Sequence, residues 1–264
     1  MIDDWLVYIT GSTVKVRRRS GFFWKRTITD IGESGWNNKD PSSLTFGQIK
    51  PTGSWSTLSI YLGSALCKIM VVDLPSGVTD LNEQHAVAQA QMHRQLSIDP
   101  TDWVCTVDAI LAPNKSVACA IRRDIFDHLN TVAAEKKLRL ISVRPYITGI
   151  WNTFQKKYAG LPHSALLVIE KDALTVICTA SGFIVAINTL GYRGEPAVIE
   201  REVRRLGMSL GSDSGQTVYL ALAEKNQTYS GVGAGQLLNR ADFLKPLRYA
   251  DFRDLLFSDD GRTT

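Results

Sequence analysis

Residues 6–18 read LVYITGSTVKVRR, and this stretch decides the fold. An apolar run reaches the short turn at Thr10-Gly11, and a second run follows in which apolar and polar residues alternate. Two such runs joined by a short turn that contains glycine are typical of a β-hairpin. A third run, FFWKRTITDI at 22–31, comes after the turn Ser20-Gly21. We therefore predict that the chain opens with three antiparallel strands.

The same arrangement returns in the second half of the chain, where three more strand-like runs follow one another. Their turns are Lys171-Asp172 and Ser181-Gly182, and each triplet is followed by helical and strand-like patterns. A repeated unit of this kind predicts an α/β protein of two similar lobes, 1–160 and 161–264, with a cleft between them. The three runs are SALLVIE at 164–170, ALTVICTA at 173–180 and FIVAINTL at 183–190.

The first lobe carries an additional strand-helix-strand-strand unit, which we expect to form a small inserted subdomain at about 65–121. Its helix is predicted to begin near Asp80, because Asp80 and Glu83 have the spacing of a capping box. Before this unit, residues 32–56 are rich in Gly, Ser, Asn and Pro, which predicts a long loop. The expected anchors of this loop are Trp36, Phe46 and Trp55.

The composition is that of a soluble globular protein, since 44% of the 264 residues are hydrophobic and 21% are charged. A net charge of +4 and a pI of about 8.8 are only mildly basic and give little support to an acidic partner. No apolar run is long enough to cross a bilayer, and Asp3 and Asp4 stand where a signal peptide would be basic. We therefore expect a cytoplasmic protein. The cysteines show no CxxC spacing and the histidines no HExxH motif, so we predict no metal site.

Several pieces of the chain, taken in order, resemble one bacterial group of actin-like proteins. A strand-like run ends at Leu74-Pro75, a helix leads to Asp99-Pro100-Thr101-Asp102, and a later strand ends near Arg144-Pro145. The hairpins at 164–190 are similar to the first hairpins of the second lobe in that group. The group comprises the type IV pilus assembly protein PilM and the cytoplasmic part of the type II secretion protein GspL. The likeness covers most of residues 5–222, whereas 30–56 and 223–264 match poorly.

This resemblance implies an actin-like (RNase H-like) two-lobed fold and a non-catalytic scaffold that is peripheral to the inner membrane on its cytoplasmic face. It implies two partners: a single-span inner-membrane assembly protein similar to PilN or GspM, and an assembly ATPase. The tail of the membrane partner is expected in a groove of the first lobe. Self-association into a homodimer is an alternative that the resemblance leaves open. PilM-like members keep an ATP site between their lobes, while GspL-like members have largely lost it. A working ATPase of the same fold is therefore the first alternative function.

The residues that a nucleotide site needs are degraded in this chain. Actin-like ATPases hold the metal with an Asp at the end of the first strand, and Tyr8 lies at or near that place. In the second lobe Glu170 and Asp172 are acidic, but Lys171 stands between them and no glycine allows backbone to approach a phosphate. We interpret these two acids as turn formers and predict no hydrolysis, no metal and no resident cofactor. Weak ATP binding is an alternative that the sequence leaves open. The residues that would bind the nucleotide are Ser12, Thr13, Lys15, Gly231 and Gly233.

A cluster of basic residues lies at 14–26, mixed with Phe22, Phe23 and Trp24. Basic residues beside aromatic ones can contact an anionic membrane surface or a nucleic acid. The favoured interpretation is a solvated hairpin tip, with membrane or protein contact as the next one. Because the total charge is low and no binding fold for nucleic acid is evident, we expect no nucleic-acid partner. The candidates for surface contact are Arg17, Arg18, Arg19, Lys25 and Arg26.

Overall fold

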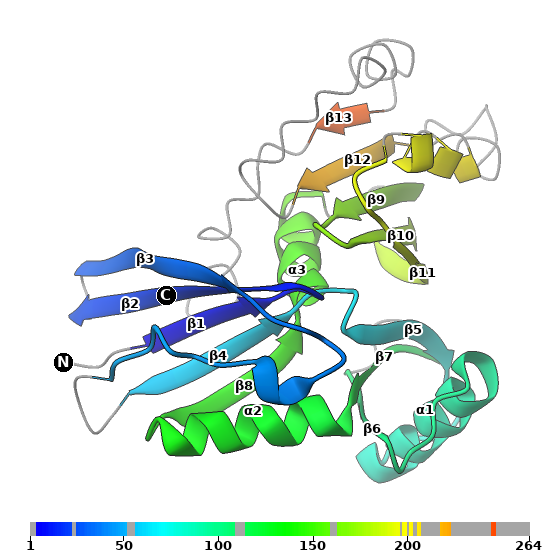
Figure 1. Ribbon diagram of the computed structural model, residues 1–264. Coiled ribbons are helices and arrows are strands. Elements are labelled where there is room, and N and C mark those ends of the chain that lie inside the picture. The colour runs from blue at the N-terminus through cyan, green and yellow to red at the C-terminus, as the bar shows by residue number, and fades with distance from the viewer. Residues whose placement is uncertain are drawn as a thin grey trace.

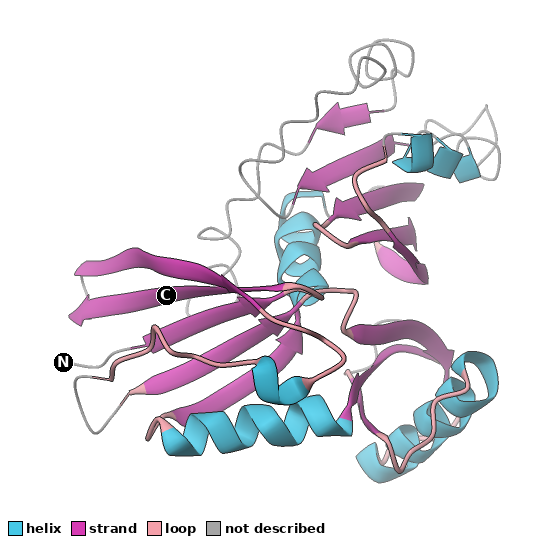
Figure 2. Cartoon of the chain, in the orientation of Figure 1, coloured by secondary structure: helices cyan, strands magenta, loops and turns pink. Residues whose placement is uncertain are grey.

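The structure is a computed structural model that describes residues 4–22, 25–51, 56–108, 114–158, 163–195, 197–199, 201–202, 205–206, 217–222 and 244–246. Within these residues the strands form two five-stranded sheets and one three-stranded sheet (Figure 1). Helices pack beside these sheets, so the chain has an α/β architecture (Figure 2).

The first sheet contains, in order across it, β3 (Lys25–Gly35), β2 (Thr13–Phe22), β1 (Asp4–Ile9), β4 (Thr57–Leu62) and β8 (Arg139–Pro145). β1 pairs antiparallel with β2, which pairs antiparallel with β3, so the predicted three-strand opening is confirmed. The turn predicted at Ser20-Gly21 is wrong, because both residues lie in β2 and pair with β3. On its other side β1 pairs in parallel with β4, and β4 pairs in parallel with β8. Trp5 to Ile9 are apolar and buried throughout, as a central strand covered on both faces requires.

The second sheet contains, in order, β11 (Phe183–Gly191), β10 (Ala173–Ala180), β9 (His163–Ile169), β12 (Thr217–Leu222) and β13 (Leu244–Pro246). β9, β10 and β11 form an antiparallel meander, and β12 pairs in parallel with β9 and with β13. This order and these directions repeat those of the first sheet. The predicted duplication is therefore confirmed at the level of the strands.

The third sheet is the inserted unit of the first lobe, with the order β5 (Cys67–Asp73), β7 (Lys115–Arg122) and β6 (Trp103–Val107). Helix α1 (Leu81–Leu96) covers one of its faces and begins where the sequence predicts. The Asp80 side chain accepts hydrogen bonds from the N–H groups of Asn82 at 2.8 Å and Glu83 at 3.2 Å. The exact domain limits of 1–160, 161–264 and about 65–121 stay a prediction.

Two further helices complete the first lobe. α2 (Arg123–Glu135) packs on the first sheet through the apolar stripe that the sequence predicts. α3 (Tyr146–Tyr158) follows β8 directly and stands between the two five-stranded sheets (Figure 2). A single apolar core extends from β1 and α3 into the second lobe, where it includes Leu166, Val168 and Ile177. In the part of the chain that the structure describes, no helix has the length and apolar content of a membrane span.

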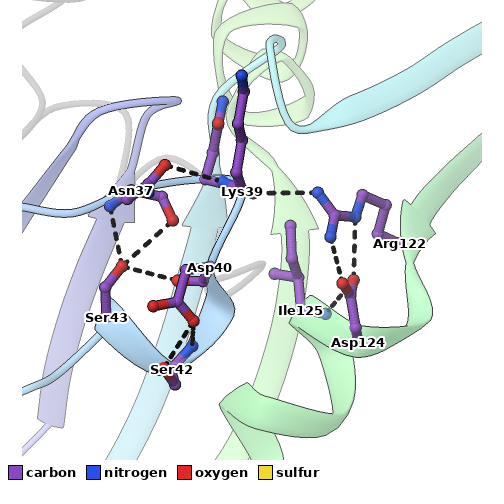
Figure 3. A network of polar contacts seen from close by, with 9 residues as sticks. Asn37, Lys39, Asp40, Ser42, Ser43, Arg122, Asp124 and Ile125 are labelled. Atoms are coloured by element: carbon purple, nitrogen blue, oxygen red, sulfur yellow. Dashed lines mark hydrogen bonds and ion pairs between the residues drawn. The ribbon is translucent and has the colours of Figure 1, made fainter.

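The segment expected as a loop at 32–56 is shorter than predicted. Residues 32–35 belong to β3, because they pair with β2 up to Thr13, and a short 3₁₀ helix, η1 (Pro41–Ser43), follows. Trp36 and Phe46 are buried as expected, while Trp55 lies outside the described residues. Polar contacts also tie the segment to α2 and its start. Arg122 donates to the Asn38 carbonyl at 3.0 Å (Figure 3). A ring nitrogen of His128 lies 2.8 Å from the Leu44 carbonyl.

Candidate functional site

Two hairpin turns with the same hydrogen-bonding pattern come together between the lobes. In the first lobe the Thr10 N–H donates to the Thr13 carbonyl at 2.8 Å, and in the second the Glu170 N–H donates to the Ala173 carbonyl at 2.9 Å. The residues enclosed by these bonds are Gly11-Ser12 in one turn and Lys171-Asp172 in the other. The duplication thus brings a glycine-containing turn together with an acidic one.

Asp172 makes the contact between these turns. The Gly11 N–H donates a hydrogen bond to Oδ2 of Asp172, although the two residues are far apart in the sequence. A Cβ atom on Gly11 would overlap this oxygen, so the contact depends on the glycine. Turn N–H groups of this kind are the donors that bind phosphate oxygens in nucleotide sites, and here a carboxylate of the same chain occupies one of them.

Glu170 makes the second contact and is fully buried. Its Oε1 accepts a 2.6 Å hydrogen bond from the Tyr8 hydroxyl, and its Oε2 accepts a 2.9 Å bond from the Ser64 N–H. Gly63 permits this approach, because a Cβ there would lie 3.0 Å from Oε1 and 3.2 Å from the Ile9 carbonyl oxygen. Both carboxylates of the acidic turn are therefore bonded to donors of the first lobe.

The pKa of Glu170 is raised to about 6: burial raises it most and the nearby Asp172 carboxylate adds to the rise, while the hydrogen bonds from Ser64 and Tyr8 oppose it. The value reflects a balance between the cost of burying a charge and the donors that stabilise that charge. Glu170 is thus a buried acid that changes its protonation state close to neutral pH.

Tyr8, which the sequence predicts at or near the place of the metal-holding acid, points its hydroxyl at Glu170. A tyrosine hydroxyl that donates to a carboxylate does not offer the anionic oxygen that Mg²⁺ prefers. Among the residues described here, no group of three or more His, Cys, Asp or Glu side chains is placed to hold a metal ion. The geometry of these two turns is that of a contact between the lobes.

Three of the five residues predicted to take part in weak ATP binding, Ser12, Thr13 and Lys15, lie at or near the same turn. Ser12 is exposed, Thr13 is buried with its Oγ1 2.9 Å from that of Thr10, and Lys15 lies 3.7 Å from Glu33. Gly231 and Gly233 lie outside the described residues. A nucleotide role for these residues stays a prediction.

Two arginines of the basic cluster in the opening hairpin form ion pairs with acidic residues. Arg17 pairs with Asp30, and Arg19 pairs with Asp4 at 2.7 Å. The Arg18 guanidinium lies 5.7 Å from the centre of the Trp5 ring. The side chains of Lys25 and Arg26 are not among those described. Arg17 and Arg19 thus bind neighbouring strands of their own sheet.

A groove of about 410 Å³ opens where the inserted subdomain, the first lobe and the second lobe meet. The resemblance implied a groove in the first lobe, but the sequence did not identify its residues, because they come from seven separate elements. Its walls are parts of β5 and β7, the C-terminal ends of β6 and β8, one face of α3, and parts of β10 and β11. They include Val107, Val143, Arg144, Trp151, Ile177 and Ile187.

Sequence comparison identifies no relative, since no family model matches this chain and no curated protein matches it. Structure comparison finds similar folds. An actin-like ATPase fold protein of unknown function from Bacteroides thetaiotaomicron is 11% identical, with a TM-score of 0.62 over 93% of this chain and 90% of that one.

Two further structures match over nearly the whole chain. The cytoplasmic domain of EpsL, an inner membrane component of the Vibrio cholerae type II secretion system, is 9% identical, with a TM-score of 0.57 over 97% of this chain and 93% of that one. A PilM-PilN type IV pilus biogenesis complex is 14% identical, with a TM-score of 0.61 over 92% of this chain and 87% of that one. The actin-like fold is therefore confirmed, and so is the expected likeness to PilM and to EpsL, a GspL protein, at the level of the fold.

Proposed function

We propose, on the premise of an actin-like fold, that this chain is a non-catalytic scaffold of a type IV pilus or type II secretion-like assembly platform. The observation that supports this most strongly is the contact between the two turns. Asp172 binds the Gly11 amide, and Glu170 binds Tyr8 and Ser64. The resemblance to actin-like ATPases implies that phosphate and metal would be held at these turns. A nucleotide would have to displace both carboxylates and would meet their negative charge.

The proposed location is the cytoplasmic face of the inner membrane. EpsL is an inner membrane component with a cytoplasmic domain of this fold, and PilM is found in a complex with PilN. By analogy, the partner of this chain is a single-span membrane protein similar to PilN or GspM, with a short cytoplasmic tail. An assembly ATPase is the second proposed partner, and self-association into a homodimer is compatible with the scaffold role.

We place the tail in the groove of about 410 Å³. Two strands that end at the groove, β6 and β8, each lie at an edge of their sheet, which leaves backbone donors and acceptors on one side for an extended chain. Apolar side chains such as Trp151 and Ile187 offer contacts for a few apolar anchors. Extended tails bind mainly by these two kinds of contact.

Calorimetric titration with Mg-ATP tests the non-catalytic role. The expected result is no saturable binding and no phosphate release. Micromolar affinity with turnover would establish the ATPase alternative instead.

A peptide titration tests the partner role, with the cytoplasmic tail of a single-span protein encoded beside this chain as the probe. Ile187→Arg places a charge in the groove and is expected to abolish binding, whereas Leu96→Arg, on an exposed residue at the end of α1, is the matched control. Equal loss in both variants, or no binding by the wild type, would contradict the groove assignment.

A further inference from the structure

The groove is built from both lobes, so its shape depends on how the lobes sit against each other. Val143, Arg144 and Trp151 come from the first lobe, while Ile177, Ile184 and Ile187 come from the second. Any rotation of the second sheet relative to β8 and α3 moves one wall of the groove against the other. Contacts that fix the position of the lobes therefore also fix the groove.

The acidic turn makes such contacts from a single short segment. Glu170 binds Tyr8 and Ser64, and Asp172 binds Gly11, so three hydrogen bonds cross between the lobes. The turn leads directly into β10, and Ile177 of this strand lines the groove. The contacts between the lobes thus lie in the turn that leads directly into the strand forming one wall of the groove.

Tyr8 connects the same contacts to the opposite wall. Its ring centre lies 4.4 Å from that of Tyr146, the first residue of α3, and the following Ile147 and Thr148 line the groove. The Tyr146 ring in turn packs edge-on against the Tyr61 ring, with 6.5 Å between the ring centres. The guanidinium of Arg144, a residue that lines the groove, lies 5.6 Å from the Tyr61 ring centre. The residue that donates to Glu170 is therefore packed against the elements that form the first-lobe wall.

We propose that Glu170 and Asp172 form a latch between the lobes, that this latch holds the groove in its present width, and that release of the latch opens the groove. The inference goes beyond the scaffold role and does not depend on which partner the groove binds. Hydrogen bonds to charged groups are strong enough for this task, since the loss of one typically changes an equilibrium by at least about ten-fold.

The test uses two substitutions that break the latch from opposite sides. Asp172→Ala removes the acceptor of the Gly11 N–H. Gly11→Ala introduces a Cβ that overlaps Oδ2 of Asp172, whereas its next contact beyond that side chain, with the Ala65 Cβ at 3.5 Å, is an ordinary one. In the double variant the overlap is gone, so the Gly11→Ala change should have little further effect.

Thiol alkylation with N-ethylmaleimide, resolved by mass spectrometry, reports the state of the groove. Cys119 lines the groove, whereas Cys105 packs on the other face of the same small sheet, towards α1, and is the internal control. Each single variant is expected to raise the alkylation rate of Cys119 relative to Cys105 by about ten-fold. The double variant should match Asp172→Ala alone.

Two results would overturn the latch. One is an unchanged Cys119 rate in folded Asp172→Ala and Gly11→Ala proteins. The other is a Gly11→Ala effect that persists in full in the Asp172→Ala background, because the overlap would then have another cause. If Gly11→Ala does not fold, Tyr8→Phe replaces it: this variant removes the donor to Glu170 but keeps the ring, and an unchanged Cys119 rate there contradicts the proposal equally.

Discussion

The hydroxyl of Tyr8, in the first strand of the first sheet, donates a 2.6 Å hydrogen bond to Oε1 of Glu170, which directly follows the first strand of the second sheet. The partners stand at closely corresponding places in the two halves of a duplicated fold. One half supplies a neutral donor and the other a buried carboxylate. The duplication has thus become asymmetric at the point where its halves meet.

The first prediction concerns pH. The pKa of Glu170 rises from 4.5 to about 6 on folding because the carboxylate is buried, so the folded protein binds this proton more tightly than the unfolded chain does. Its contribution to stability is therefore fully present below about pH 4.5 and is lost as the pH rises through 6. The shift corresponds to about 2 kcal/mol.

Glu170→Gln measures this contribution, because an amide can accept from the Ser64 N–H and donate to the Tyr8 oxygen without charge. The stability of the variant relative to the wild type, from urea unfolding, should increase by about 2 kcal/mol between pH 4.5 and 7.5. The other titratable groups that face Glu170 are Tyr8, Asp172 and Cys67. Asp73→Asn, on an exposed carboxylate, is the control and should show no such rise.

The second prediction concerns the donor. Tyr8→Phe keeps the ring that packs on Tyr146 but removes the hydroxyl, so the buried Glu170 loses one of its hydrogen bonds. We expect a loss of about 1–3 kcal/mol in unfolding free energy at pH 7.5. The loss should be smaller at pH 5, where Glu170 is largely protonated. A loss that is independent of pH would mean that the hydroxyl stabilises the protein through something other than the charge of Glu170.

Local features of this fold could be predicted from the sequence. The turn Lys171-Asp172, the start of α1 at Asp80 and the buried stripe of α2 rest on neighbours within a few residues, and all are found. The first turn, predicted at Thr10-Gly11, lies one residue later, at Gly11-Ser12. β3 was placed too short, because Gly32, Glu33, Ser34 and Gly35 have a loop-like composition. Their pairing with β2 overrides that local preference.

The contacts between the lobes could not be predicted in this way. Glu170 and Asp172 stand in a turn, where acidic residues are common, and nothing near them in the sequence indicates Tyr8, Gly11 or Ser64 as partners. The groove was not identified for the same reason. What the sequence did supply was the duplication, which implies that the two turns face each other.

The third prediction concerns the ion pairs of the opening hairpin. Arg19 and Asp4 lie 2.7 Å apart, and their side chains are only 12% and 17% exposed. Arg19→Ala leaves Asp4 with little water and without this partner, so we expect a loss of roughly 1–3 kcal/mol in unfolding free energy. Lys115→Ala is the matched control, because its pair with Asp73 is much more exposed, and about 0.2–1 kcal/mol is typical of such pairs. Equal losses would show that burial does not distinguish the two pairs.

The fourth prediction concerns the segment 36–50, which Arg122 ties to the start of α2 (Figure 3). Arg122 donates to the Asn38 carbonyl and pairs with Asp124. Arg122→Ala should therefore raise backbone hydrogen exchange in 36–50 by roughly ten-fold, the effect of one lost hydrogen bond from a charged donor.

The neighbouring Arg123 provides the control for this last test. Its guanidinium donates to the carbonyls of Thr101 at 2.7 Å and Pro100 at 3.0 Å, on the side of the inserted subdomain. Arg123→Ala should leave exchange in 36–50 unchanged and raise it near residues 100–103. If both variants raise exchange in 36–50 equally, the effect comes from a loosened start of α2, and the Arg122 contact with Asn38 does not hold the segment.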